Sequence, residues 1–92
     1  MSVVERKVVV SNPLGIHARP AALIVQAASR FKSDISFSKG EVRGVNGKSI
    51  MGVMMLAAEQ GSEITIQARG EDAEEAVEVI SELLQSDFED KI

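Results

Sequence analysis

The chain of 92 residues contains no cysteine, tryptophan or tyrosine. Without cysteine it can form no disulfide framework, no thiolate zinc site and no thiol nucleophile. Its aromatic side chains are three phenylalanines, too few for a base-stacking platform, so we expect no nucleic-acid partner. No apolar run reaches the roughly 20 residues that span a bilayer, and the first residues lack a signal-peptide pattern. We therefore expect a cytoplasmic protein without membrane insertion.

Catalytic chemistry has few candidates. His17 is the only histidine, and because no carboxylates cluster around it in the sequence, we expect no metal site. No Gly-x-Ser-x-Gly motif is present, which argues against a serine-type triad. Nothing in the sequence indicates a cofactor.

The composition is that of a globular protein, and its charge is unevenly distributed. Apolar residues make up 45% and charged residues 26% of the chain, so we expect one domain over residues 1–92. Residues 1–48 hold eight basic and three acidic side chains, whereas residues 49–92 hold two basic and eleven acidic ones. This asymmetry favours a basic face for an acidic partner or an anion. The acidic half is equally consistent with a charged helix that aids solubility.

Hydrophobic periodicity predicts seven elements. Segments of alternating or β-branched residues predict strands, and apolar residues spaced by three and four predict helices. The strands cover 5–11, 35–38, 41–45 and 63–68, and the helices cover 17–31, 50–56 and 70–84. The order β-α-β-β-α-β-α predicts a two-layer α+β sandwich with helices over one face of a sheet.

The second predicted helix is apolar on nearly every side. A short surface helix cannot bury all of Ile50, Met51, Val53, Met54, Met55 and Leu56, so we expect some of them to be exposed. An exposed methionine-rich surface is suited to docking a partner. The alternative is a short helix inserted deeply into the core.

Pro20 indicates where the first helix begins. Proline fits only the first turn of a helix, which places the helix start near His17 and leaves the amides of Ala18 and Arg19 free. A helix N-terminus attracts anions, and the Arg19 guanidinium adds donors for phosphate oxygens. We infer that His17 is a nucleophile whose ring nitrogen accepts a phosphoryl group held by these donors. From spacing alone, His17 could equally be a helix N-cap or a residue packed in a loop.

Two segments carry a resemblance to a known family. Residues 15–21, Gly-Ile-His-Ala-Arg-Pro-Ala, resemble the active-site signature of HPr, the phosphocarrier of the bacterial phosphoenolpyruvate-dependent phosphotransferase system. Residues 48–54, Lys-Ser-Ile-Met-Gly-Val-Met, are similar to the regulatory serine segment of that family. The resemblance implies an open-faced β-sandwich, in which three helices cover a four-stranded antiparallel sheet.

The resemblance also implies a function. The histidine that matches His17 is phosphorylated on Nδ1 by enzyme I, which draws on phosphoenolpyruvate, and the phosphate then passes to IIA proteins or domains. Arg19 matches the residue that steadies the phosphate. Such a protein is a covalent relay and not an enzyme with its own turnover, and a monomer suffices for this role.

Two further groups of residues have roles in the family. Ser49 matches the serine that HPr kinase/phosphorylase modifies in many bacteria, although a serine there can also be a plain N-cap. The short second helix belongs to the family's docking surface. The residues expected to meet partners are Lys48, Ile50, Met51 and Met54, with Arg19 beside them.

Two positions depart from the sugar-transport pattern. Leu14 replaces a small polar residue and is shared with the nitrogen-related branch of the family, and Gly47 replaces an apolar residue. The alternative function is therefore a nitrogen-branch carrier, or a regulatory module that binds metabolic enzymes or transcription factors. A regulatory module would be expected to lack His17. A small-ligand domain with His17 as a polar contact would instead require a pocket at that residue.

Overall fold

The computed structural model describes residues 2–86, which form four strands and three helices in the predicted order. The elements are β1 (Ser2–Val9), α1 (Ala18–Ala28), β2 (Asp34–Lys39), β3 (Val42–Asn46), α2 (Ile50–Met55), β4 (Glu63–Gly70) and α3 (Ala73–Leu84). One of the three phenylalanines, Phe88, and the last acidic residues of the chain lie outside the described part. Within it, no helix is both long enough and apolar enough to cross a membrane.

The predicted bounds differ from the observed ones mainly where helices and strands end. Strand β1 begins earlier than predicted, at Ser2, and ends earlier, at Val9. Beyond this end, Val10 still forms hydrogen bonds with the segment before β4. Helix α1 ends at Ala28 because the following amides of Arg30 and Phe31 bond to carbonyls three residues back. This tightening is common in the last turn of a helix.

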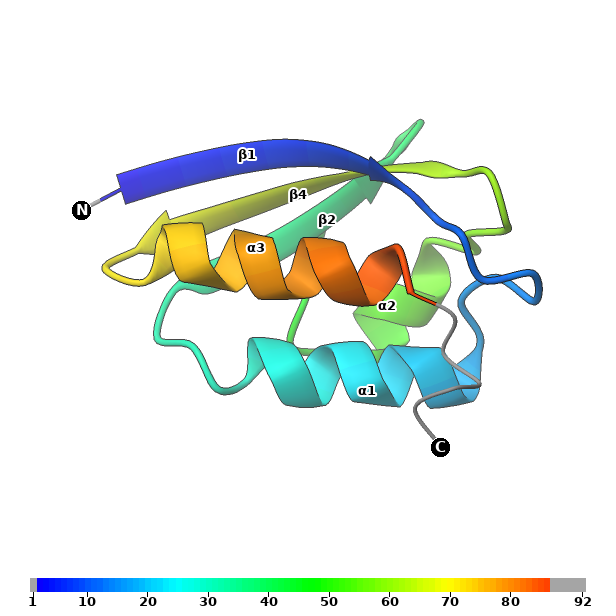
Figure 1. The fold of residues 1–92 in the computed structure, drawn as a ribbon, viewed down its shortest axis with the longest axis horizontal. Helices are drawn as coiled ribbons and strands as arrows, with labels where there is room; N and C mark the ends of the chain where they lie inside the picture. Colours follow the sequence, from blue (N-terminus) through cyan, green and yellow to red (C-terminus); the bar gives the residue numbers. More distant parts are fainter. Residues whose placement is uncertain (1, 87–92) are drawn as a thin grey trace.

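All four strands form one antiparallel sheet in the order β1-β4-β2-β3. Strands β2 and β3 form the predicted hairpin, whose turn includes Gly40 at a φ of +55°. Strand β4, which comes last in sequence, fits between β1 and β2. The three helices lie on one side of the sheet (Figure 1). The predicted open-faced sandwich is therefore confirmed.

The core lies between the sheet and the helices. Alternate residues of β2 and β4 point inward and meet the apolar stripes of α1 and α3. This follows from the two-residue period of strands and the 3.6-residue period of helices. The fully buried large side chains include Phe37, Ile24, Leu56, Ile64, Ile66, Ile80 and Leu84.

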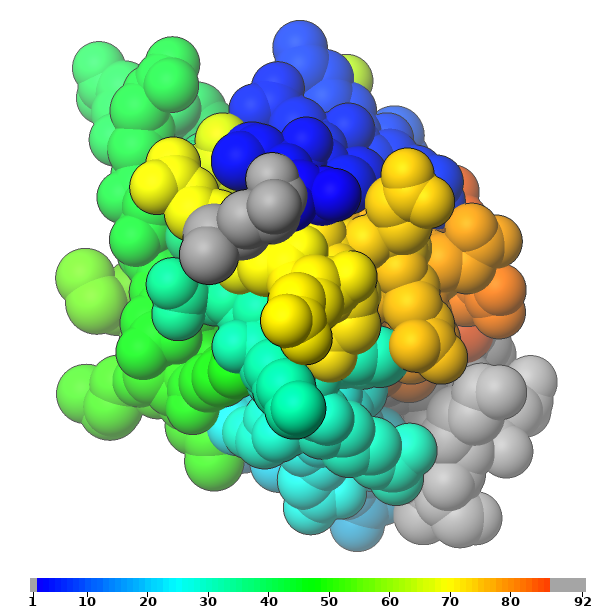
Figure 2. Space-filling view, turned by 90° about the vertical axis from the view of Figure 1, so that its left-hand side faces the viewer, coloured from blue at the N-terminus to red at the C-terminus, as the bar shows by residue number. Residues whose placement is uncertain are grey.

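A hydrogen-bonded clamp closes one end of the sandwich. The Asp72 carboxylate, just before α3, accepts hydrogen bonds from the Ser33 hydroxyl (2.6 Å), the Ser33 amide (3.0 Å) and the Lys32 amide (2.9 Å). Gly70 lies against Ser33 so closely that an added Cβ would be 2.5 Å from its Oγ. Figure 2 shows this end, where the segment after α1 (cyan to green) touches the turn between β4 and α3 (yellow). Asp72 thus joins two segments about 40 residues apart in sequence.

Asp72 should make the stability of the fold depend on pH under acidic conditions. Its hydrogen bonds, led by that from the Ser33 hydroxyl, lower the pKa of Asp72 from 3.8 to about 2. Since the folded state favours the carboxylate, its stabilisation is complete above about pH 4 and is lost as the pH falls towards about 2. We expect Asp72→Asn to be less stable than the unmodified chain at neutral pH, and the difference to shrink over that range. Urea unfolding at several pH values measures it.

Glu71→Gln provides the control, because Glu71 is an exposed carboxylate beside Asp72. Its unfolding midpoint should follow that of the unmodified chain over the same pH range. Parallel pH profiles for Asp72→Asn and the unmodified chain would contradict the role given to Asp72.

Candidate phosphate-acceptor site at the start of helix α1

The start of α1 presents His17 to solvent. His17 is the N-cap residue with extended backbone, and its carbonyl accepts the amide of Ala21 at 2.9 Å. Pro20 occupies the first turn and is buried, whereas His17, Ala18 and Arg19 are exposed. The helix start that Pro20 predicted is therefore confirmed.

The backbone of this first turn provides donors for an anion. The amides of Ala18 and Arg19 lie too early in the helix to find an intrahelical carbonyl. Within residues 2–86 they donate to no other protein group, and the His17 side chain does not cap them. The partial positive charge of the helix end stabilises a nearby anion by about 0.3–1 kcal/mol. The positive charge of the exposed Arg19 side chain adds to this stabilisation.

The loop before His17 is held by the segment that follows α2. Gly15 has a φ of +71°, and a Cβ there would lie 2.6 Å from the Ala58 carbonyl oxygen. The next residue, Ile16, is buried and donates its amide to that same oxygen at 2.9 Å. The Gln60 side chain also donates to the Ser11 carbonyl at 3.3 Å. These hydrogen bonds fix the backbone of the loop that leads to His17 and the start of α1.

Helix α2 is partly exposed, as its composition predicted. Ser49 is its N-cap, and the hydroxyl accepts the Gly52 amide at 3.2 Å. One side of the helix enters the core through Val53 and Leu56. The other side leaves Ile50, Met51, Met54 and Met55 exposed, Met51 by 74%. Sequence reasoning did not assign Met55 to the docking surface, although it is more exposed than Met54.

The two helices beside the site run in opposite directions. The Lys48 ammonium donates to the Phe31 carbonyl, beyond the C-terminal end of α1, at 2.8 Å. The Ala58 carbonyl contacts Ile16 near the N-terminal end of α1. Ser49 therefore lies towards the far end of α1, and Met54 and Met55 lie nearer His17. Lys48, which was expected to border the docking surface, is partly exposed, and its place in docking stays a prediction.

A strained residue joins α2 to the segment that holds the loop. Ala57, directly after α2, has a φ of +48°, a left-handed conformation that costs about 1–2 kcal/mol in residues other than glycine. The Lys39 ammonium donates to its carbonyl at 3.0 Å. Because of this turn, the carbonyl of the next residue, Ala58, faces the Ile16 amide and accepts its hydrogen bond.

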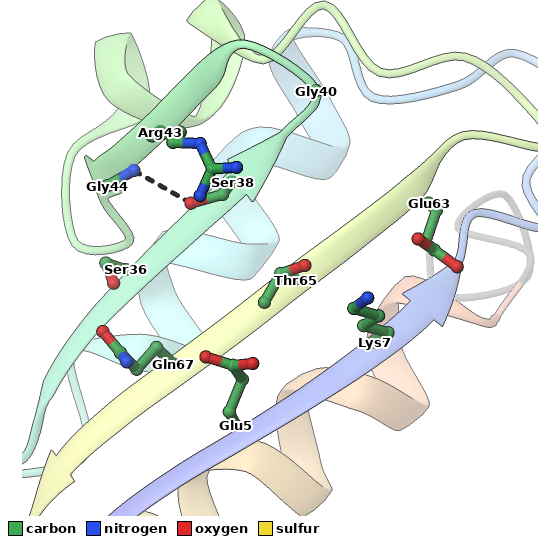
Figure 3. A pocket seen from close by; sticks show the side chains of 10 residues that line it. All are labelled: Glu5, Lys7, Ser36, Ser38, Gly40, Arg43, Gly44, Glu63, Thr65 and Gln67. Carbon is green, nitrogen blue, oxygen red and sulfur yellow. Dashed lines mark hydrogen bonds between the residues drawn. The ribbon is translucent and has the colours of Figure 1, made fainter.

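A separate hollow lies on the uncovered face of the sheet (Figure 3). Its volume is about 530 Å³. Side chains from all four strands line it, among them Lys7, Arg43, Thr65 and Gln67. His17, Arg19 and Ser49 do not border it. A small-ligand domain with His17 as a polar contact is therefore not supported by this hollow.

Comparison with known proteins places the chain in a family. Residues 4–86 match the family model described as the PTS HPr component phosphorylation site. The chain is 51% identical over 88 residues to the phosphocarrier protein HPr of Treponema pallidum, covering 96% of this chain and 99% of that protein. It is 48% identical over 84 residues to the HPr-like protein Crh of Bacillus subtilis, covering 91% and 98%. The open-faced sandwich is thus that of a phosphocarrier protein. The chain belongs to the HPr family.

Solved structures agree with this assignment. The crystal structure of HPr from Bacillus anthracis superposes with a TM-score of 0.86 at 49% identity, covering 92% of this chain and all of that one. A crystal structure of Crh from Bacillus subtilis is described as a swapped, intertwined dimer; its TM-score is 0.70 at 48% identity, with 88% and 92% covered. Since a relative forms a dimer, family membership does not imply a monomer, and the monomer expected above stays a prediction.

The strain at Ala57 generates a prediction about stability. Ala57→Gly should raise the free energy of unfolding by about 0.5–1 kcal/mol, because glycine adopts the left-handed conformation freely but loses more entropy on folding. Ala57 is exposed, so no buried contact is lost. The matched control is Ala58→Gly, which removes a buried methyl group and should destabilise the fold. Denaturant unfolding measures both, and a destabilised Ala57→Gly variant would contradict the assigned strain.

Proposed function

We propose that this protein is a phosphocarrier that accepts a phosphoryl group from phospho-enzyme I on His17 Nδ1 and passes it to IIA proteins or domains. The observation that carries the proposal is that His17 is exposed at the start of α1, within residues 4–86, which match the phosphorylation-site family model. Retention of the histidine favours this relay over a purely regulatory module.

The transfer requires little more than positioning. The lone pair of neutral Nδ1 attacks phosphorus while the bond from phosphorus to enzyme I breaks, so one N–P bond forms at His17 and no water takes part. The amides of Ala18 and Arg19 and the Arg19 guanidinium can stabilise the phosphoryl oxygens. In the second step a nucleophile of IIA attacks the same phosphorus, and the imidazole leaves. His17 is then unphosphorylated again. The protein is therefore the phosphoryl acceptor in the first transfer and the phosphoryl donor in the second.

His17→Ala should abolish phosphate transfer without unfolding the protein, because His17 is exposed and its side chain forms no capping hydrogen bond. The measurement is intact mass after incubation with enzyme I, magnesium and phosphoenolpyruvate. We expect an acid-labile phosphate on the unmodified chain and none on the variant, with the two circular dichroism spectra alike.

The enzyme I used must first be shown to phosphorylate another HPr. With that control, two outcomes contradict the proposed function. One is an unmodified chain that gains no phosphate, and the other is a His17→Ala variant that gains it equally well.

We also propose that phosphorylation of Ser49 by an HPr kinase/phosphorylase regulates docking. Its hydroxyl is half-buried at the N-cap of α2, next to the exposed Ile50 and Met51. A phosphate there would add a charge of roughly −2 beside the surface that meets acidic partners. The antiparallel helices place Ser49 away from His17, so the added charge would act on the shared partner and not on the imidazole.

Ser49→Asp mimics part of that charge and keeps a residue that caps helices well. We expect its affinity for enzyme I to fall roughly five- to tenfold at low salt, as about 1 kcal/mol of like-charge repulsion implies. Added salt should reduce the difference. Isothermal titration calorimetry measures the affinity. Ser2→Asp, which adds the same charge at the exposed beginning of β1, is the control, and equal affinities for the two variants would refute charge repulsion at Ser49.

A further inference from the structure

A buried amide side chain lies in the loop before His17. Asn12 is 1% exposed, although it follows the end of β1 in a connecting loop. Its Nδ2 donates to the Gly15 carbonyl at 2.7 Å. Its Oδ1 is buried and, among residues 2–86, has no hydrogen-bond partner. A buried polar atom without a partner lowers stability, so its presence in a small core needs an explanation.

The orientation of this amide is fixed by chemistry. If the amide group were turned over, Oδ1 would face the Gly15 carbonyl oxygen, and two acceptors cannot form a hydrogen bond. Nδ2 must therefore face Gly15. The unpaired Oδ1 is the consequence of directing the donor into the loop.

Asn12 closes the loop with two hydrogen bonds. Besides the Nδ2 bond to the Gly15 carbonyl, the Asn12 carbonyl accepts the Gly15 amide at 2.9 Å. Both the amide and the carbonyl of Gly15 are thereby held by one residue. The carbonyl group of Gly15 belongs to the peptide bond with Ile16, whose amide donates to Ala58. The orientation of that peptide plane determines how the backbone reaches His17.

We propose that Asn12 is a positioning residue for His17. Its buried amide group fixes the orientation of the Gly15–Ile16 peptide, and this orientation determines the direction in which the imidazole points. The inference rests on the proposed function. Phosphoryl transfer depends on a close approach of Nδ1 to phosphorus, and a displacement of about 1 Å can cost about a hundredfold in rate. Without the Asn12 donor, only the bond from the Ile16 amide to the Ala58 carbonyl holds that peptide plane, so the Gly15 carbonyl can tilt and His17 samples other directions.

The chain offers a matched control for the unpaired oxygen. Ser81, on α3, is 3% exposed, and its hydroxyl also has no partner among residues 2–86. Within the described part of the chain, Ser81 has no hydrogen bond to the loop before His17. If Asn12 had only a structural role, its replacement by an apolar residue should resemble that of Ser81 and leave transfer unchanged.

The experiment compares Asn12→Leu and Asn12→Ala with Ser81→Ala. Leucine has the branched shape of asparagine but is larger, whereas alanine is smaller and cannot clash. Both remove the donor, so an effect that the two variants share does not come from a clash. Transfer from phospho-enzyme I is measured by rapid quench over a range of concentrations. We expect both Asn12 variants to lower kcat at least tenfold with KM changed less than twofold, because the exposed docking surface is intact. Ser81→Ala should keep both constants.

Two results would overturn the inference. Folded Asn12 variants that transfer phosphate at the rate of the unmodified chain would do so. A loss confined to KM would also do so, since it would place the effect on docking. Failure of the proposed function is a different result, because the unmodified chain would then accept no phosphate.

A measurement on the unmodified chain does not depend on whether the variants fold. In ¹⁵N NMR spectra, a side-chain NH₂ proton of Asn12 should be protected from exchange with solvent, as a buried donor to the Gly15 carbonyl requires. Rapid exchange of both protons would contradict the hydrogen bond and with it the role of Asn12.

Discussion

The hydrogen bond from the Ile16 amide to the Ala58 carbonyl is the constraint on which the site depends. It joins the loop after β1 to the turn after α2, two segments that the sequence separates by about 40 residues. The same carbonyl oxygen leaves no room for a side chain on Gly15. Because α1 begins immediately afterwards, its first turn is fixed relative to α2. The histidine and the exposed methionines therefore form parts of one surface.

Hydrogen bonds join distant segments at two ends of the molecule. At one end, Asp72 ties the segment after α1 to the turn before α3. At the other, Asn12, Gly15 and Ala58 hold the loop that leads to His17. The apolar core between them fixes the distance of the helices from the sheet but does not orient the loops. Hydrogen bonds are directional, so those at the two ends orient the loops, which the burial of apolar surface alone does not do.

The features predictable from sequence were those with a local cause. Pro20 located the start of α1 because proline restricts its own and neighbouring backbone, and alternation located the strands because side chains point to opposite faces. The burial of Asn12 was not predicted, since nothing in its neighbourhood in the sequence shows that its side chain would be buried. The insertion of β4 between β1 and β2, and the bond from Lys48 to Phe31, join residues distant in sequence. Local periodicity contains no information about such pairs.

Among the residues that the structure describes, the strand order leaves β1 and β3 with one unpaired edge each. Exposed edges are templates on which further strands of other molecules can assemble. On β1, the three consecutive charges of Glu5, Arg6 and Lys7 lie along that edge and are exposed. Another strand could pair with β1 only if it removed these charged side chains from water or placed opposite charges beside them. The charges on β1 thus protect a small, half-covered sheet against aggregation while its helical face remains free to meet partners.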